Sequence, residues 1–205
     1  TVLNRKTWHA FTPKVGVSWQ VTPLAFLFAS YARGFDAGGF NNRALTLATA
    51  LPYEPETVNT YEAGFKTDWF DRRLRVNATA FYNDYSNLQT SVSAYSPISG
   101  TYVSTRGNAP SAHTKGFELE TSAQPTNRLQ LGFNITYLKT RYDDYSAPAY
   151  GTVPAYNYTG KAFAGQPEWQ YFANVNYDIP VDRIGKITLG GSVNWQTSYF
   201  SDILN

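Results

Sequence analysis

The fold is decided between residues 61 and 82, where the chain reads Tyr61-Glu62-Ala63-Gly64-Phe65-Lys66-Thr67-Asp68-Trp69 and, after a short polar break, Leu74-Arg75-Val76-Asn77-Ala78-Thr79-Ala80-Phe81-Tyr82. One parity of each arm is mainly apolar, and the other carries the charges. Successive side chains of a strand point to opposite faces, so this stretch predicts a β-hairpin with one apolar and one polar face. Arms of about 9–11 residues with a charged polar face are typical of a transmembrane β-barrel.

The composition excludes several other classes of protein. The 205 residues include no Cys and no Met, and the net charge is only +2. A near-neutral chain lacks the basic stripe expected of a nucleic-acid-binding protein, and without Cys there are no disulfides or thiolate metal sites. The longest apolar run, at 24–29, is far shorter than the roughly 20 residues of a membrane helix. The mean hydropathy of −0.38 is compatible with barrel strands, whose polar face dilutes the apolar one.

The same alternation recurs in four predicted hairpins. Their turns are expected near residues 20–23, 70–73, 124–128 and 180–185, where Pro, Asp and Asn favour turns. Three longer segments separate the hairpins, at about 34–57, 87–112 and 139–167, and we expect them to be loops because they show no sustained period. Short turns on one side and long loops on the other are typical of outer-membrane barrels. The arm at 24–33 is apolar on both parities, and its faces stay unassigned.

On the other arms the charged side chains lie on the polar parity. A bilayer requires this, because a Lys or Arg that faces lipid at mid-depth destabilises the barrel by about 2–4 kcal/mol. Lys115 is an exception near the loop end of its strand. Tyr and Trp near the turns and loop ends predict two interfacial girdles. Six side chains are predicted to face outward: Phe65, Val76, Leu131, Phe133, Val175 and Leu189. The alternative is a soluble β-sandwich, whose strands are usually shorter.

Four passages resemble the TonB-dependent receptors of Gram-negative outer membranes, in the C-terminal part of their barrel. They lie at 29–41, 54–66, 74–89 and 116–120, and the resemblance extends over nearly the whole chain. It implies a 22-stranded antiparallel barrel around a plug domain, embedded in outer-membrane lipid. It also implies a motif that engages an inner-membrane TonB-type energy-coupling protein. About eight strands are recognisable here, so we expect residues 1–205 to be a partial barrel domain, with the plug and remaining strands elsewhere in the same receptor.

No catalytic or metal-binding set stands out in the sequence, and we expect no cofactor. His9 and His113 are isolated and have no partner at metal-ligand spacing. Glu118 and Glu120 share one face and could suggest paired acid and base carboxylates. On a barrel wall we expect them instead to meet basic side chains of neighbouring strands or of the plug.

The predicted loops hold the candidate ligand-binding residues. Five tyrosines crowd the third loop: Tyr142, Tyr145, Tyr150, Tyr156 and Tyr158. Aromatic rings with polar tips suit planar or sugar-like ligands, but the same rings could simply pack the loop. Arg33 and Arg106 could bind an anionic ferric chelate, because guanidinium favours oxygen anions.

The resemblance therefore implies a ligand-gated active-transport receptor for a scarce small-molecule nutrient, with a ferric siderophore-type chelate favoured. Cobalamin and a glycan stay open as ligands. Two alternatives belong to other classes. One is a complete eight-stranded barrel serving as a structural anchor, and the other is a barrel-embedded hydrolase.

Overall fold

The computed structural model describes residues 5–41, 52–96, 100–147, 155–183 and 185–202, and its elements are all strands. Eight of them form one antiparallel sheet in the order β1-β2-β5-β6-β7-β8-β11-β12. Their bounds are β1 Lys14–Thr22, β2 Ala25–Asp36, β5 Glu56–Trp69, β6 Leu74–Ser96, β7 Thr101–Thr126, β8 Leu129–Asp144, β11 Trp169–Val181 and β12 Gly185–Gln196. Two short ribbons pair β3 (Gly39–Phe40) with β4 (Pro52–Tyr53) and β9 (Ser146–Ala147) with β10 (Tyr156–Asn157). Across the described ranges there is no helix long and apolar enough to cross a membrane.

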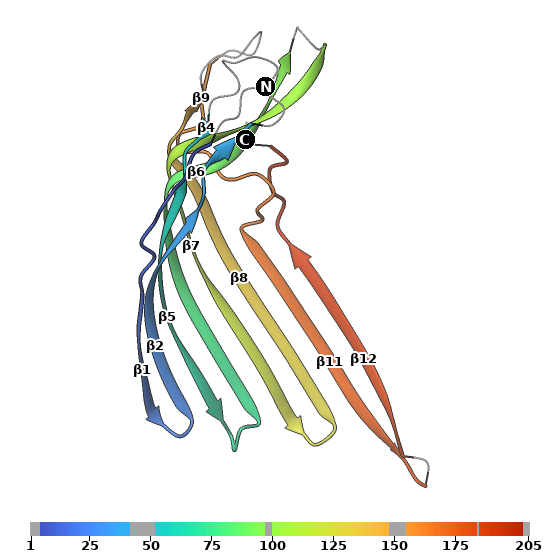
Figure 1. Ribbon diagram of the computed structural model, residues 1–205. Helices are drawn as coiled ribbons and strands as arrows, with labels where there is room; N and C mark the ends of the chain where they lie inside the picture. Colours follow the sequence, from blue (N-terminus) through green and yellow to red (C-terminus); the bar gives the residue numbers. More distant parts are fainter. Residues whose placement is uncertain (1–4, 42–51, 97–99, 148–154, 184, 203–205) are drawn as a thin grey trace.

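All four predicted hairpins are confirmed. Their tight turns lie together at the bottom of Figure 1, and the other ends of the strands lie at the top. The turn between β5 and β6 is unusual because three successive residues that are not glycine have positive φ, namely Phe70 (53°), Asp71 (54°) and Arg72 (65°). This left-handed geometry lets a four-residue link reverse the chain between Trp69 and Leu74, which are cross-strand partners.

The predicted loop at 87–112 is wrong. β6 and β7 continue as paired strands through this segment, and the pairing extends to Ser96 opposite Thr101. β8 likewise runs to Asp144, beyond the expected loop start at residue 139. The physical reason is that a hairpin beyond the bilayer can have water on both faces, so its sequence needs no apolar parity. The apolar/polar alternation that identified the other strands is therefore absent from residues 87–112.

The sheet is open. Within the described residues β1 and β12 are its two edges and do not pair with each other, as predicted for part of a larger wall. Each edge strand presents a row of unpaired N–H and C=O groups, which a bilayer cannot satisfy. The arrangement therefore differs from that of a closed eight-stranded anchor.

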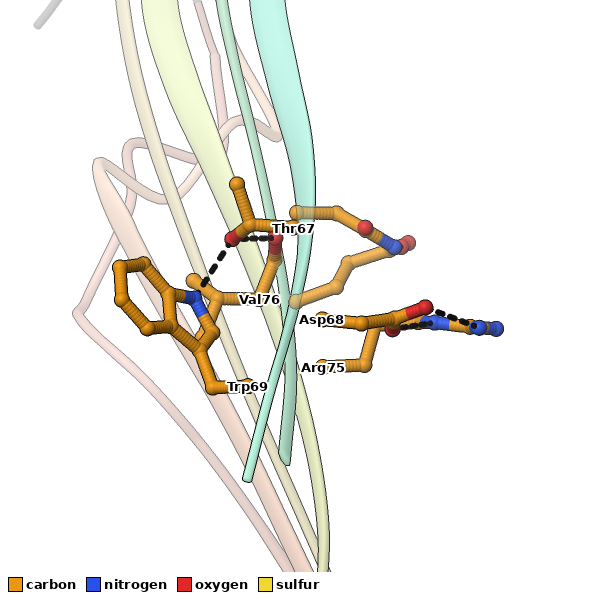
Figure 2. A network of polar contacts seen from close by, with 7 residues as sticks. Thr67, Asp68, Trp69, Arg75 and Val76 are labelled. Atoms are coloured by element: carbon orange, nitrogen blue, oxygen red, sulfur yellow. Dashed lines mark hydrogen bonds and ion pairs between the residues drawn. The ribbon is translucent and has the colours of Figure 1, made fainter. Parts of the chain in front are cut away.

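The cross-strand register sorts the side chains onto two faces. One row on the apolar face crosses the whole sheet and comprises Trp19, Leu27, Phe65, Ala78, Leu119, Ile135, Tyr171 and Trp195. All six side chains predicted to face outward share this face. Figure 2 shows the separation near one turn: Trp69 points to one side, and the Asp68–Arg75 ion pair (2.8 Å) points to the other. Thr67 is tolerated on the apolar face because its hydroxyl donates to the Val76 carbonyl (3.1 Å) and accepts from the Trp69 indole (2.9 Å).

Register also assigns the arm that the sequence left open. Leu27 lies opposite Phe65 and so belongs to the apolar face, whereas Phe26 and Phe28 belong to the polar face. The Phe28 ring covers Gly64 on the next strand, and a Cβ at Gly64 would lie 2.7 Å from that ring. A large ring over a glycine therefore explains an aromatic residue on the polar face.

An aromatic belt lies on the apolar face at the loop end of the strands. Ring contacts join Tyr31, Tyr61 and Tyr82 on one side of the sheet, with centroid distances of 5.2 and 6.4 Å. On the other side the contacts join Phe117, Tyr137, Trp169, Tyr171 and Trp195. Such a belt marks the membrane interface and agrees with the predicted girdle at the loop ends.

Candidate functional site

Buried side chains gather at the loop end of the sheet. Ala109, Ala112, Tyr142, Tyr145 and Tyr158 form one cluster, with the three tyrosines only 4–6% exposed. Tyr85, Leu88 and Phe163 pack against it. These residues come from β6, β7, β8 and the segment after β8. The cluster therefore joins the segment after β8 to the hairpin formed by β6 and β7.

Backbone hydrogen bonds fix the same segment. The Tyr142 N–H donates to the Lys161 carbonyl (3.0 Å), and the Gly160 N–H donates to the Tyr142 carbonyl (2.7 Å). The Tyr158 N–H donates to the Tyr145 carbonyl at 2.8 Å. Burial raises the pKa of Tyr145 to about 12, and the neighbouring phenols Tyr142 and Tyr158 add to the shift. The cluster is therefore neutral at physiological pH and holds the shape of the loop.

A second group of residues surrounds Arg106 at the top of β7. The Asn41 side chain binds the Arg106 backbone twice, accepting from its N–H (2.8 Å) and donating to its carbonyl (3.0 Å). The Arg106 guanidinium lies 5.6 Å from the centre of the Tyr53 ring. Asn108 binds the Glu54 backbone in the same two-way manner, at 2.8 and 2.9 Å. Amide side chains thus tie the β3–β4 region to β7 and leave the guanidinium exposed.

Two carboxylates lie beside this group. Glu56 is the direct cross-strand partner of Asp36, and both belong to the polar face. Glu56 accepts a hydrogen bond from the Gln89 N–H at 2.7 Å. Burial raises the pKa of Glu56, and the Asp36 charge adds to this, while the Gln89 N–H and Arg106 oppose it. The loop end of the polar face therefore offers charges of both signs next to aromatic rings.

The structure separates the predicted ligand-binding residues. Tyr142, Tyr145 and Tyr158 are buried in the cluster, while Tyr156 stays 38% exposed and contacts the Tyr158 ring at 4.7 Å. Tyr150 lies outside the described residues. Among the arginines, Arg106 lies close enough to Glu56 of the polar face for its charge to lower the pKa of that carboxyl group. Arg33 lies on the apolar face, in the row of Asn59 and Asp84.

No sequence pattern points to Asn41, Tyr53, Glu56 or Asn108. Their roles depend on contacts between segments 20 or more positions apart, and no local pattern signals such contacts. The expectation for the two glutamates is also not met within the described strands, where Glu118 lies opposite Thr79 and Thr136, and Glu120 lies opposite Asn77 and Asn134. Their cross-strand neighbours are thus hydroxyl and amide side chains rather than basic ones.

Neither histidine lies in a metal-binding group. His113 Nδ1 is 2.7 Å from the Asp143 carboxylate, and this ring stacks on Tyr82 at 5.7 Å. In the part of the chain that the structure describes, no three His, Cys, Asp or Glu side chains are grouped so that they could hold a metal ion.

Comparison with known families agrees with this architecture. Residues 2–205 match the family described as TonB dependent receptor-like, beta-barrel. The chain belongs to this family. TonB-dependent receptors are transport receptors of Gram-negative outer membranes rather than enzymes. Because the wall of such a barrel is surrounded by lipid, the apolar face of this chain faces lipid and its polar face lines the lumen.

Several receptors for metal chelates are similar to this TonB-dependent receptor chain. The metal-pseudopaline receptor CntO of Pseudomonas aeruginosa is 34% identical over 128 residues, which is 62% of this chain and 16% of that protein. The ferric-pyoverdine 358 receptor of Pseudomonas putida is 29% identical over 91% of this chain and 20% of its own length. The chain thus spans about a fifth of these relatives.

Solved structures share the fold. The ferric yersiniabactin uptake receptor FyuA of Yersinia pestis superposes with a TM-score of 0.72 at 19% identity, covering 93% of this chain and 26% of that one. The siderophore receptor PiuA of Acinetobacter baumannii gives a TM-score of 0.68 at 19% identity, covering 94% and 26%. At this identity the likeness supports the fold alone.

Proposed function

We propose that this chain is part of the barrel wall of a receptor that imports a ferric siderophore-type chelate across the outer membrane. The observation that carries the proposal is the exposed Arg106 guanidinium, held beside Tyr53 at the loop end of the lumen face. Guanidinium binds anionic oxygens, and an adjacent aromatic ring suits a planar group. Relatives named as receptors for ferric pyoverdine and metal-pseudopaline support a metal chelate as the ligand.

The proposed ligand contacts are Arg106 and Tyr156. Both side chains are exposed at the loop end, whereas the buried phenols of Tyr142, Tyr145 and Tyr158 would act by shaping the loop. Arg33 is left out of the proposed site because its face is the one that carries the aromatic belt.

We further propose that the lumen face surrounds a plug domain, and that a TonB-type inner-membrane protein supplies energy through another segment of the receptor. Polar hollows on this face would receive a polar partner, and one of them is lined by Asn134, Thr136, Gln170 and Asn194.

The test is uptake of radiolabelled iron by cells that lack their own siderophore receptors and produce the full-length receptor containing this chain. A panel of ferric chelates with hydroxamate, catecholate and aminocarboxylate groups would identify the ligand. The variant Arg106→Gln should weaken chelate binding by about 10–100-fold, because it removes a charge-assisted contact of about 1.5–3 kcal/mol.

Arg128→Gln is the matched control, because Arg128 lies at a tight turn at the opposite end of the wall. Unchanged uptake in this control alongside loss in Arg106→Gln would support the site. Full activity of Arg106→Gln with every transported chelate would contradict the assignment of Arg106, and absence of transport of any chelate would contradict the function itself.

A further inference from the structure

Two lysines on the apolar face lie directly opposite each other. Lys115 on β7 is the cross-strand partner of Lys139 on β8, and both are exposed. Directly opposed side chains have Cβ atoms only about 5 Å apart, and like charges in such positions destabilise a sheet. Among the described residues neither ammonium group makes an ion pair with a carboxylate. The pair is therefore a local concentration of positive charge that no direct ion pair neutralises.

Two carboxylates nearby serve other side chains. Asp143 lies 2.7 Å from His113 Nδ1 and 4.0 Å from Arg141 Nε, and His113 and Arg141 form the next cross-strand pair toward the loops. Asp84 is the partner of His113 on β6, so these two carboxylates offset the charge of the second pair, and the basic site is confined to the two lysines. Tyr82, the partner of Lys115 on β6, adds a hydroxyl at the near edge.

The lysines lie immediately beyond the aromatic belt. The preceding pair toward the membrane is Phe117 with Tyr137, whose rings are 5.8 Å apart. Two strand residues span about 6.6 Å, so the ammonium groups lie at the depth of lipid headgroups when the belt lies at the interface. Apolar rings below and paired cations above form an amphipathic surface that matches a lipid with an anionic headgroup.

We propose that Lys115 and Lys139 together bind a phosphate group on the headgroup of an outer-leaflet lipid, whose acyl chains cover Phe117 and Tyr137. Lysine is a common phosphate ligand, and a phosphate between the two ammonium groups would convert their repulsion into attraction. The lipid is preferred to free phosphate because the belt contributes acyl-chain contacts only to a molecule anchored in the bilayer. This site is on the outside of the wall and is distinct from the proposed chelate site in the lumen.

The test is equilibrium binding of lipid to the detergent-solubilised full-length receptor, measured by native mass spectrometry. The probes are a diacyl glycolipid with a phosphorylated sugar, the same lipid after removal of its phosphate, and inorganic phosphate alone. The double variant Lys115→Gln/Lys139→Gln should bind the phosphorylated lipid at least about tenfold more weakly, because each basic residue near an anionic lipid surface contributes about 1 kcal/mol.

Two further variants control the experiment. Lys115→Arg/Lys139→Arg keeps both charges and should keep binding, and Lys66→Gln removes a lysine from the lumen face and should leave it unchanged. Heat-dependent gel mobility would check that every variant is folded. Equal binding of the dephosphorylated lipid, or unchanged affinity in the double glutamine variant, would overturn the proposal. Competition by inorganic phosphate as strong as by the intact lipid would assign the site to free phosphate and also reject the lipid.

Discussion

Replacing Phe65 by Arg tests the assignment of faces on which the whole architecture rests. Phe65 lies on β5 four residues from Tyr61 in the aromatic belt and four residues from Trp69 at the turn. At about 3.3 Å per residue it is roughly 13 Å along the strand from each, so it lies near the middle of the hydrocarbon layer. Its cross-strand partners Leu27 and Ala78 are apolar and offer no counter-ion.

An Arg at mid-depth on the lipid face of a barrel costs about 2–4 kcal/mol. We therefore expect Phe65→Arg to lower the free energy of unfolding of the full-length receptor by about this amount. The assay is reversible denaturant unfolding in lipid vesicles, followed by tryptophan fluorescence, with Phe65→Leu as a size-matched apolar reference. A shift in the midpoint without a change in slope would show that stability alone has changed.

The matched control is Thr79→Arg. Thr79 lies one residue from Ala78, which belongs to the same cross-sheet row as Phe65, but it points to the polar face opposite Glu118. Introducing the same charge there should change the unfolding free energy by less than about 1 kcal/mol. If Phe65→Arg proves as mild as Thr79→Arg, the apolar face does not contact lipid and the assignment of faces fails.

Substitutions at three other positions, Tyr142, Tyr145 and Gly64, test the loop end and the wall. Tyr142→Ala should remove a buried ring and destabilise the loop cluster by about 3–5 kcal/mol, detected as faster amide hydrogen exchange in the segment after β8, while Tyr142→Phe should have a smaller effect. Because the folded pKa of Tyr145 is about 12 and the unfolded value is about 10, its contribution to stability is complete below pH 10 and is lost as the pH rises toward 12. Unfolding measured between pH 9 and 12 should show this loss, and Tyr145→Phe should reduce it. Gly64→Val should lower stability because its Cβ would meet the Ala78 carbonyl oxygen as well as the Phe28 ring, so the double variant Gly64→Val/Phe28→Ala should recover only the part of the loss that is due to the ring.

The strands that cross the membrane could be predicted from the sequence because the bilayer imposes a rule on every residue. Between Trp69 and Tyr82, strand side chains of one parity face lipid and those of the other face water. A single charged side chain facing lipid would lower the free energy of unfolding by several kcal/mol. The hairpin turns followed from the same constraint, since each turn is where the parity pattern ends. Beyond the belt no such rule acts, and residues 87–112 therefore looked like a loop although they form paired strands.

The candidate ligand site was only partly predictable for a related reason. Aromatic rings and guanidinium groups could be counted along the chain, but the sequence does not say which of them become buried. Tyr142 and Tyr156 look alike in the sequence, yet the first is buried on the strand and the second is exposed on β10. The direction of Arg33 depended on the register of β2, an arm whose two parities are both apolar.

Register explains the lysine pair as well. Lys115 and Lys139 are 24 positions apart, on either side of the turn between β7 and β8, and each alone is an ordinary basic residue of its strand. The pairing of β7 with β8 places them opposite each other, and the parity set by Phe117 and Tyr137 places both on the lipid side. The repulsion between the two ammonium groups lowers the stability of the lipid-free wall, and the same two charges raise its affinity for an anionic headgroup. Both effects therefore have a single electrostatic origin. They should therefore disappear together: Lys115→Gln/Lys139→Gln should make the lipid-free wall no less stable while it weakens binding of the phosphorylated lipid.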